Sequence, residues 1–208
     1  TKAIERAQKA IEANNYAIRR HVMEYDNILN IQRNIIYEDR DRLFEEDIIE
    51  VVFKIVKAEI EAIVNHYLVI AQDEKKDTYT KLIQREIKEL TGIEISHKIL
   101  KHLSAEEIFD EIKYRFNNKI TGYNKELVAK YFREIALNIV DSAWSEYINI
   151  ISELQKGIHL QVYGNKNPLI EFQLKSSKLF DNLIYNIQTR IVKDIFHAKL
   201  DSILKDSL

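Results

Sequence analysis

The chain has 208 residues, of which 46% are hydrophobic and 31% charged, with a formal net charge of -2. This nearly balanced charge gives no overall attraction to nucleic acid, and we expect no nucleic-acid partner. Because the sequence contains no cysteine, disulfides and thiolate metal sites within the chain are excluded. No apolar run reaches the roughly 18 residues of a membrane-spanning helix, so we expect any membrane contact to be peripheral.

One proline and four glycines leave few breaks along the chain, which is the composition of an all-α fold. We expect residues 1–44 to form a long scaffold helix from Lys2 to about Leu43, some 60 Å long at about 1.5 Å per residue. Such a helix is too long for a compact domain and is suited to bracing several other elements. Its apolar residues recur at helical steps: Ile4, Ala7, Ile11, Ile18, Val22, Tyr25, Leu29 and Ile36.

Residues 45–122 are predicted to form a smaller helical subdomain. An apolar-rich helix is expected from Glu46 to Ala71, and a second one from Asp77 to Leu90, where Thr91-Gly92 ends it. Ser104 with Glu107 forms a capping box that opens a third helix. The polar stretch 117–122 is a plausible boundary before the remaining part of the chain.

Residues 123–208 are predicted to form two long helices joined by a loop. Gly157 and Gly164 permit a turn, and Pro168 suits the first turn of a new helix, so we expect the first helix to break near Lys156. The loop is unusually apolar and also basic, because it carries Ile158, Leu160, Val162, Tyr163, Lys156 and Lys166. The expected helix stripes are Val128, Tyr131, Ile135, Ile139, Ala143, Tyr147, Ile150 and Leu154, then Phe180, Ile184, Ile187, Ile191, Ile195 and Ala198.

Two groups of residues resemble the C-terminal half of SecA, the ATP-driven motor that pushes preproteins into the SecY channel. The first group matches the family pattern around the two-helix finger: Asp141, Ser142, Trp144, Glu146, Gly157, Ile158, Leu160, Tyr163, Lys166, Pro168, Glu171 and Phe172. The second group matches the family's scaffold helix: residues 3–9, Ile18-Arg19, residues 24–27, Gln32-Arg33 and Ile36-Tyr37. The two groups cover roughly the first 43 and last 85 residues, in the family's order.

The resemblance implies a scaffold helix, a wing at 45–122 and a two-helix finger with a returning scaffold helix. It places Tyr163 at the family's substrate-contacting tip, so the expected contacts with preprotein and the SecY-type channel are Tyr163, Leu160, Val162 and Lys166. The scaffold would dock the parent protein's N-terminal motor domains, for which we expect a face made by Ile18, Val22, Tyr25 and Leu29. ATP and magnesium would bind in those motor domains, and the protein would be cytoplasmic and peripheral at the inner face of the membrane.

Departures from the family pattern indicate a diverged paralogue. Gln161 stands where the family has Arg, Val162 where it has Gly, and Tyr147 where it has His; Gly164, Asn165 and Asn167 also differ. These substitutions point towards the accessory SecA that some Gram-positive bacteria dedicate to a few exported surface proteins.

We expect no catalytic residue, cofactor or metal site in this chain. No phosphate-binding loop occurs, and His97 and His102 are five residues apart rather than the three or four that place two ligands on one helix face. Glu45-Glu46-Asp47 is interpreted as a helix N-terminus, and Trp144 as a packing residue. Two alternatives remain open, an all-α interaction or oligomerisation module unrelated to export and a helical enzyme with a convergent site.

Overall fold

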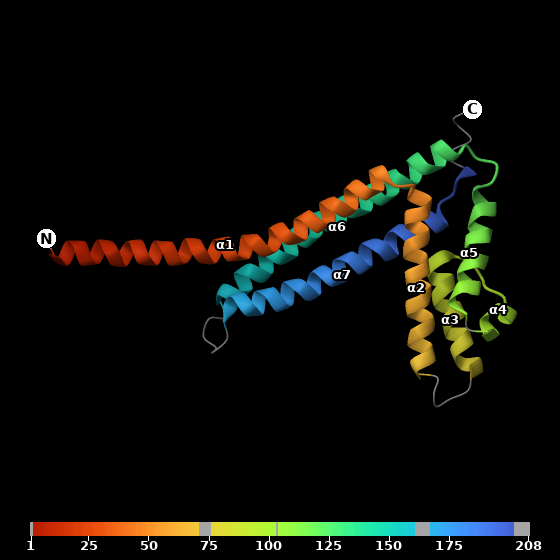
Figure 1. Ribbon diagram of the computed structural model, residues 1–208, viewed down its shortest axis with the longest axis horizontal. Helices are drawn as coiled ribbons and strands as arrows, with labels where there is room; N and C mark the ends of the chain where they lie inside the picture. The colour runs from red at the N-terminus through yellow and green to blue at the C-terminus, as the bar shows by residue number, and fades with distance from the viewer. Residues whose placement is uncertain (1, 71–75, 103, 161–166, 202–208) are drawn as a thin grey trace. The chain divides into compact units, whose positions relative to one another are not determined.

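The computed structural model describes residues 2–70, 76–102, 104–160 and 167–201. All regular structure in these ranges is helical, which confirms the predicted all-α class (Figure 1). No described helix has the combined length and apolarity to cross a bilayer. The helices are α1 Lys2–Glu45, α2 Ile48–Ile70, α3 Lys76–Thr91, α4 His97–His102, α5 Ala105–Ile120, α6 Lys125–Leu160 and α7 Pro168–His197.

Residue contacts divide the chain into two compact units. Unit 1 contains residues 1–39 and 142–184, and unit 2 contains residues 40–141 and 185–208. Helices α1, α6 and α7 each contribute to both units, so the units are not consecutive segments of sequence. The predicted boundaries at 44 and 122 describe a different division, and they stay predictions.

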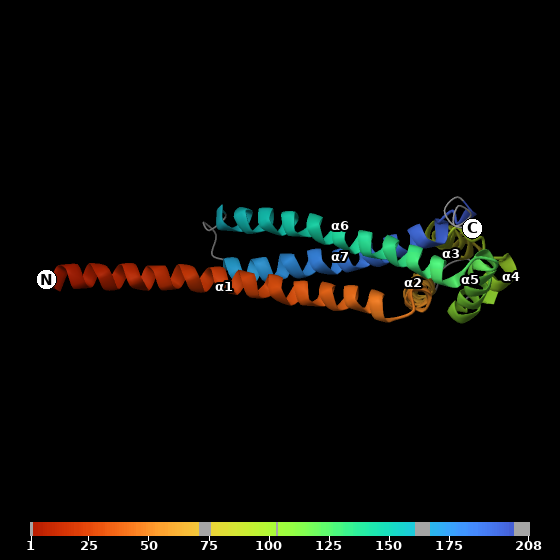
Figure 2. The same ribbon diagram turned by 90° about the horizontal axis from the view of Figure 1, so that it is seen from above.

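Unit 1 is a three-helix arrangement of α1 with the adjoining halves of α6 and α7. In this unit α6 runs antiparallel to α1, and α7 runs parallel to it (Figures 1 and 2). The N-terminal half of α1 lies beside no other described helix in either view, and every described side chain from Lys2 to Met23 is exposed. From Tyr25 onward the same helix has buried positions, because α6 and α7 cover one of its faces.

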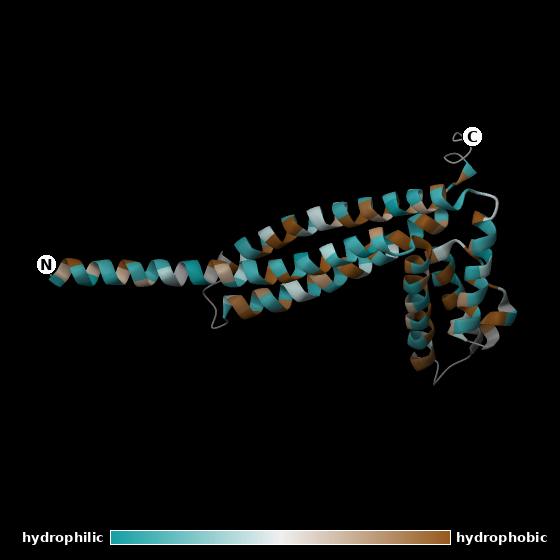
Figure 3. Ribbon diagram, turned by 45° about the horizontal axis from the view of Figure 1, so that its top comes forward, coloured by the Kyte–Doolittle hydropathy of each residue, from teal (hydrophilic) through white to brown (hydrophobic). Residues whose placement is uncertain are grey.

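Unit 2 has its core where α2 packs against α3 and α5. The small helix α4 packs against α3 and α5. Phe116 lies at the centre of an aromatic cluster, with its ring 5.6 Å from Phe53, 5.9 Å from Phe132 and 4.4 Å from Phe196. Apolar and polar residues are interspersed along each helix (Figure 3). In an amphipathic helix the apolar residues recur every three or four positions and so lie on one face.

Several helix ends follow from their sequences. The Ser104 hydroxyl accepts a hydrogen bond from the Glu107 amide, so the predicted cap of α5 is confirmed. Gly92 has a φ of 69° just after α3, which confirms that Thr91-Gly92 ends this helix. The Asp47 carboxylate accepts from the Ile49 amide at 2.9 Å, which confirms that the acidic run precedes a helix N-terminus.

The predicted break near Lys156 is wrong, because α6 continues through Gly157 to Leu160. Ile158, which we expected on the loop surface, is buried with 3% exposure. Glycine in a helix costs about 1 kcal/mol relative to alanine, whereas burying an isoleucine side chain contributes about 1.5–3 kcal/mol, so burial outweighs the glycine penalty. The predicted stripe of α6 is buried at Val128, Ile139, Ala143 and Tyr147, but near its end it is wrong by one position, since Ile150 is exposed and Ile151 buried.

Two glycine substitutions test these assignments in opposite directions. Gly157→Ala should raise the free energy of unfolding by roughly 0.5–1 kcal/mol, because Gly157 is helical and has open space around an added Cβ. Gly92→Ala should lower it by about 1–2 kcal/mol or more, because the backbone is left-handed there and the new Cβ would lie 3.0 Å from Nε2 of His197. Urea unfolding of both variants provides the measurement. Destabilisation by Gly157→Ala would contradict the helical assignment of Gly157 and support a turn there.

Candidate functional site at the finger and the long helix

The predicted substrate-contacting residues surround the connection between α6 and α7. Leu160 is the last residue of α6, and its side chain lies outside the described residues. Val162, Tyr163 and Lys166 also lie outside the described residues. The structure therefore places the helices on either side of this connection, and the contacts of the four side chains stay predictions.

The start of α7 is fixed by its cap and by an aromatic contact. The Asn167 side-chain oxygen accepts a hydrogen bond from the Leu169 amide at 3.0 Å, directly before the helix. One turn further on, Phe172 is fully buried, and its ring lies 4.7 Å from that of Tyr25 on α1 in an edge-to-face arrangement. The first turns of α7 are thus held against the long helix.

The four predicted docking residues do not share one free face. Tyr25 is only 2% exposed because Phe172 covers its ring, so Tyr25 is not available for docking another domain. Its burial, and secondarily Glu24, raise the pKa of the Tyr25 phenol. Val22 is 50% exposed and Leu29 half-buried, whereas the side chain of Ile18 lies outside the described residues. Docking through Val22 and Leu29 stays a prediction.

A buried polar junction connects the three helices of unit 1. The Tyr147 hydroxyl on α6 donates a hydrogen bond to Oε1 of Gln32 on α1 at 2.9 Å, and it lies 3.2 Å from the carbonyl oxygen of Ser176 on α7. The Gln32 side-chain amide donates to the same carbonyl at 3.5 Å. Gln32, Tyr147 and Ser176 are 6%, 3% and 0% exposed, so water cannot replace these partners without opening the helices.

The surroundings of Tyr147 keep its phenol neutral. Burial raises the pKa of the hydroxyl well above the ordinary value, and nearby Asp181 adds a smaller upward effect. Trp144 stacks on Tyr147 with a centroid distance of 5.5 Å, which confirms the predicted packing role of Trp144. Phe180 contacts the same ring edge-to-face at 5.8 Å. The hydroxyl is therefore a fixed, neutral hydrogen-bond donor.

Neither Gln32 nor Ser176 is among the predicted site residues, although the spacing contains a signal for both. Gln32 follows Leu29 by three residues and precedes Ile36 by four, so it lies on the apolar stripe of α1. Ser176 lies four residues from each of two buried phenylalanines on α7, Phe172 and Phe180. A polar side chain at a core position needs a buried partner. Tyr147 provides it for Gln32, whereas the Ser176 hydroxyl donates to the Gln173 carbonyl of its own helix and only the Ser176 backbone carbonyl faces Tyr147.

The described residues provide packing and anchoring rather than a reaction centre. In the described ranges no three histidine, aspartate or glutamate side chains gather as metal ligands. The side chains of His97 and His102 lie outside those ranges, although both residues belong to the six-residue helix α4. The arrangement can hold a hairpin rigidly on a long helix and present the connection at its end.

Removing the Tyr147 hydroxyl should destabilise the fold through the partners that it leaves behind. We expect Tyr147→Phe to lower the free energy of unfolding by about 1–3 kcal/mol, because Gln32 Oε1 would lose its buried donor. Gln32→Leu combined with Tyr147→Phe should cost less than the sum of the single substitutions, since both polar groups are then gone. Tyr114→Phe is the control, because Tyr114 is 64% exposed. Additive effects in a double-mutant cycle would contradict a coupled junction.

Comparisons with known proteins show to which family the chain belongs. The chain matches the family described as SecA Wing and Scaffold domain over residues 1–199. It is 30% identical to the protein translocase subunit SecA of Halothermothrix orenii over 205 residues, covering 96% of this chain and 24% of that protein. It is 32% identical to the SecA of Aquifex aeolicus over 207 residues, with coverage of 97% and 21%.

A third relative, the SecA of Acetivibrio thermocellus, is 31% identical over an alignment of 212 residues. This alignment, with its gaps, covers 96% of this chain and 23% of that protein. The chain thus spans between a fifth and a quarter of the length of these relatives. Because the family match extends over nearly all of its residues, the chain belongs to the SecA wing and scaffold domain family.

Proposed function

We propose that the chain is the part of a SecA-type protein translocase that carries movement from the motor domains to the preprotein. The α6–α7 hairpin, here called the finger, would reach the mouth of a SecY-type channel with its connecting segment. The observation that carries this proposal is the anchoring of the finger on α1 by Tyr25, Phe172 and the Gln32–Tyr147–Ser176 junction. Movement of α1 would then move the finger, because buried contacts resist sliding between packed helices.

The finger connection supports contact with a substrate of variable sequence. It carries the apolar residues Leu160 and Val162, the aromatic Tyr163 and the cationic Lys166. A tyrosine ring can stack on many side chains while its hydroxyl bonds to backbone groups, so it grips peptides without selecting one sequence. Lys166 would meet acidic or carbonyl groups at the channel mouth. These four residues would form the contact with preprotein and channel.

The exposed half of α1 supports docking of the motor domains. Ile4, Ile11, Tyr16, Val22 and Met23 are each at least 50% exposed, so this segment has apolar side chains without a partner among the described residues. Most helical stability in proteins comes from tertiary packing of one face, so covering a face of this segment would stabilise it. The relatives have more than three quarters of their length outside the matched region, which is ample chain for such a partner.

The remaining assignments follow from the family. ATP and magnesium would bind in the motor domains of the parent protein, and this chain alone would neither bind nor hydrolyse ATP. The parent protein would work in the cytoplasm, peripherally at the inner face of the membrane. The departures at Gln161, Val162, Gly164 and their neighbours support the accessory paralogue. Membership of the family favours this proposal over the alternative of a helical module unrelated to export.

Tyr163→Ala in the full-length parent protein tests contact with the preprotein. We expect transport to decrease several-fold while basal ATP hydrolysis and helix content stay unchanged, because the residue would contact cargo and no core. Transport of a purified preprotein into vesicles containing the channel measures this directly, and Tyr163→Phe is the matched control that keeps the ring. A photocrosslinker at position 163 should capture preprotein or channel during transport. Normal transport by the alanine variant together with no crosslink would refute the assignment.

Charged substitutions on the exposed half of α1 test the docking face. Val22→Asp with Met23→Asp should weaken binding of this chain to a separately made motor fragment by a few kcal/mol, because a carboxylate would be buried where an apolar side chain was. Titration calorimetry gives the affinity, and Tyr114→Asp on α5 is the control with similar exposure. An unchanged affinity in the double variant would place the docking face elsewhere.

A further inference from the structure

Helices α1 and α2 meet at a joint of two residues. Helix α1 ends at Glu45 and α2 begins at Ile48, so only Glu46 and Asp47 connect them. Each residue has two rotatable backbone angles, and a few degrees of change at these angles would redirect the whole of α2. The direction in which α2 leaves α1 therefore depends on what holds Glu46 and Asp47.

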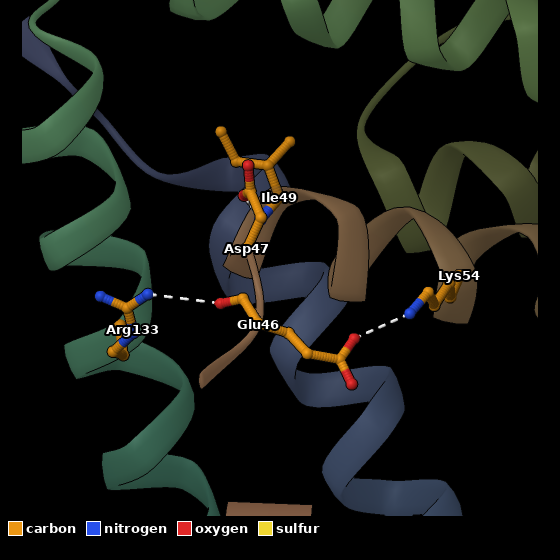
Figure 4. A network of polar contacts seen from close by, with 5 residues as sticks. All are labelled: Glu46, Asp47, Ile49, Lys54 and Arg133. Carbon is orange, nitrogen blue, oxygen red and sulfur yellow. Dashed lines mark hydrogen bonds and ion pairs between the residues drawn. The ribbon is translucent and has the colours of Figure 1, made fainter. Parts of the chain in front are cut away.

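Arg133 of α6 holds the α1 side of this joint. Its Nε donates a hydrogen bond to the carbonyl oxygen of Leu43 at 2.6 Å. Its Nη2 donates to the carbonyl oxygen of Glu46 at 3.4 Å, as Figure 4 shows. Carbonyls in the last turn of a helix have no partner within the helix and form the negative end of its dipole. The Arg133 guanidinium satisfies the Leu43 carbonyl in the last turn of α1 and also the Glu46 carbonyl within the joint.

Residues of the joint and of α2 hold its other side. The Glu46 carboxylate lies 2.7 Å from the ammonium group of Lys54, two turns into α2, and this pairing lowers the pKa of Glu46 (Figure 4). Asp47 accepts a hydrogen bond from the Ile49 amide and thereby caps α2. Glu46 thus binds α6 through its backbone and α2 through its side chain.

A second arginine also connects α1 with α6, but this one lies on α1 and its partner lies on α6. Arg40 of α1 donates through Nε to Oδ1 of Asp141 on α6 at 3.0 Å, while its guanidinium carbon lies 5.4 Å from the Phe44 ring. The side chain of Arg40 is 36% exposed and that of Asp141 56%, so water screens this pair more than the partly buried Arg133 contacts. Arg133 is therefore the stronger constraint on the joint.

We propose that Arg133 is a positioning residue that locks the α1–α2 joint and so places α2 and the wing helices packed on it under the control of α6. The wing is defined here as α2 to α5. With Arg133 in place, the end of α1, the joint and the first half of α6 move together. Without it, the joint rotates about Glu46 and Asp47 while the core of the wing stays folded. This inference concerns unit 2 alone and holds whether or not the finger contacts a preprotein.

Spin labels across the joint test the lock. The chain has no native cysteine, so Asp41→Cys on α1 and Glu61→Cys on α2, both exposed, can be labelled selectively. We expect a narrow distance distribution by pulsed electron resonance, and at least a twofold broader one after Arg133→Met. Arg133→Lys, which keeps the charge and one donor direction, should restore part of the narrowing. Arg115→Met is the control, since Arg115 pairs with Glu111 on the exposed surface of α5.

Amide exchange separates a local lock from a general loss of stability. The amide of Glu46 donates to the Arg42 carbonyl at 2.9 Å, and that of Ile49 donates to Asp47. Both should exchange about tenfold faster in Arg133→Met, which corresponds to the loss of a hydrogen bond from a charged donor. Buried α2 amides such as those of Val56 and Ile60 should exchange as before. Equal acceleration throughout α2, or an unchanged distance distribution, would overturn the proposal.

Discussion

The hydrogen bond between Tyr147 and Gln32 inside unit 1 is the interaction on which the finger depends. Apolar stripes alone specify that α1, α6 and α7 pack together, but they select one register less sharply, because one aliphatic contact resembles the next. A phenol and an amide buried in the same interface do not. Shifting one helix by a single residue turns its side chains by about 100° and would leave both polar groups without partners, at a cost of about 1–3 kcal/mol each.

The long helix α1 has two halves that differ in exposure. Up to Met23 the described side chains of α1 are exposed, whereas from Tyr25 the helix is covered by α6 and α7. The covered half fixes the finger, and the exposed half has apolar side chains available for another domain. A single helix with both properties can carry a displacement from one partner to another, because an α-helix is stiff along its axis over these lengths. This is the physical basis of the proposed coupling.

Much of the fold could be predicted because local signals determine it. The all-α class, the cap at Ser104 and the stop at Gly92 follow from residue types whose backbone preferences act over a few residues. The continuation of α6 through Gly157 could not be predicted, because the tertiary burial of the neighbouring Ile158 decides whether the helix continues past this glycine. The burial of Tyr25 could not be predicted either, because its partner Phe172 lies far away in the sequence.

Of the candidate site, the sequence indicated the helices of the finger but not its anchor. Gln32 and Ser176 stand among apolar residues, and only the fold shows which tyrosine meets them. The role of Arg133 could not be predicted from the sequence either, because its partners are backbone carbonyls, which every residue type has. The tip residues, including Tyr163, depend on the resemblance to SecA, and their contacts stay a prediction.

Hydrogen exchange along α1 is the sharpest test of whether buried contacts join the finger to this helix, because the covered and exposed halves belong to one continuous helix. We expect amides from Tyr25 to Asp39 to exchange together with those of α6 from residue 142 to 158 and of α7 from 168 to 184, as one cooperative unit. Amides from Ile4 to Val22 should exchange at least tenfold faster, since marginal helices without packed neighbours open readily. Uniform exchange along α1, or exchange of residues 25–39 independent of the finger, would contradict the claim that buried contacts join the finger to the long helix.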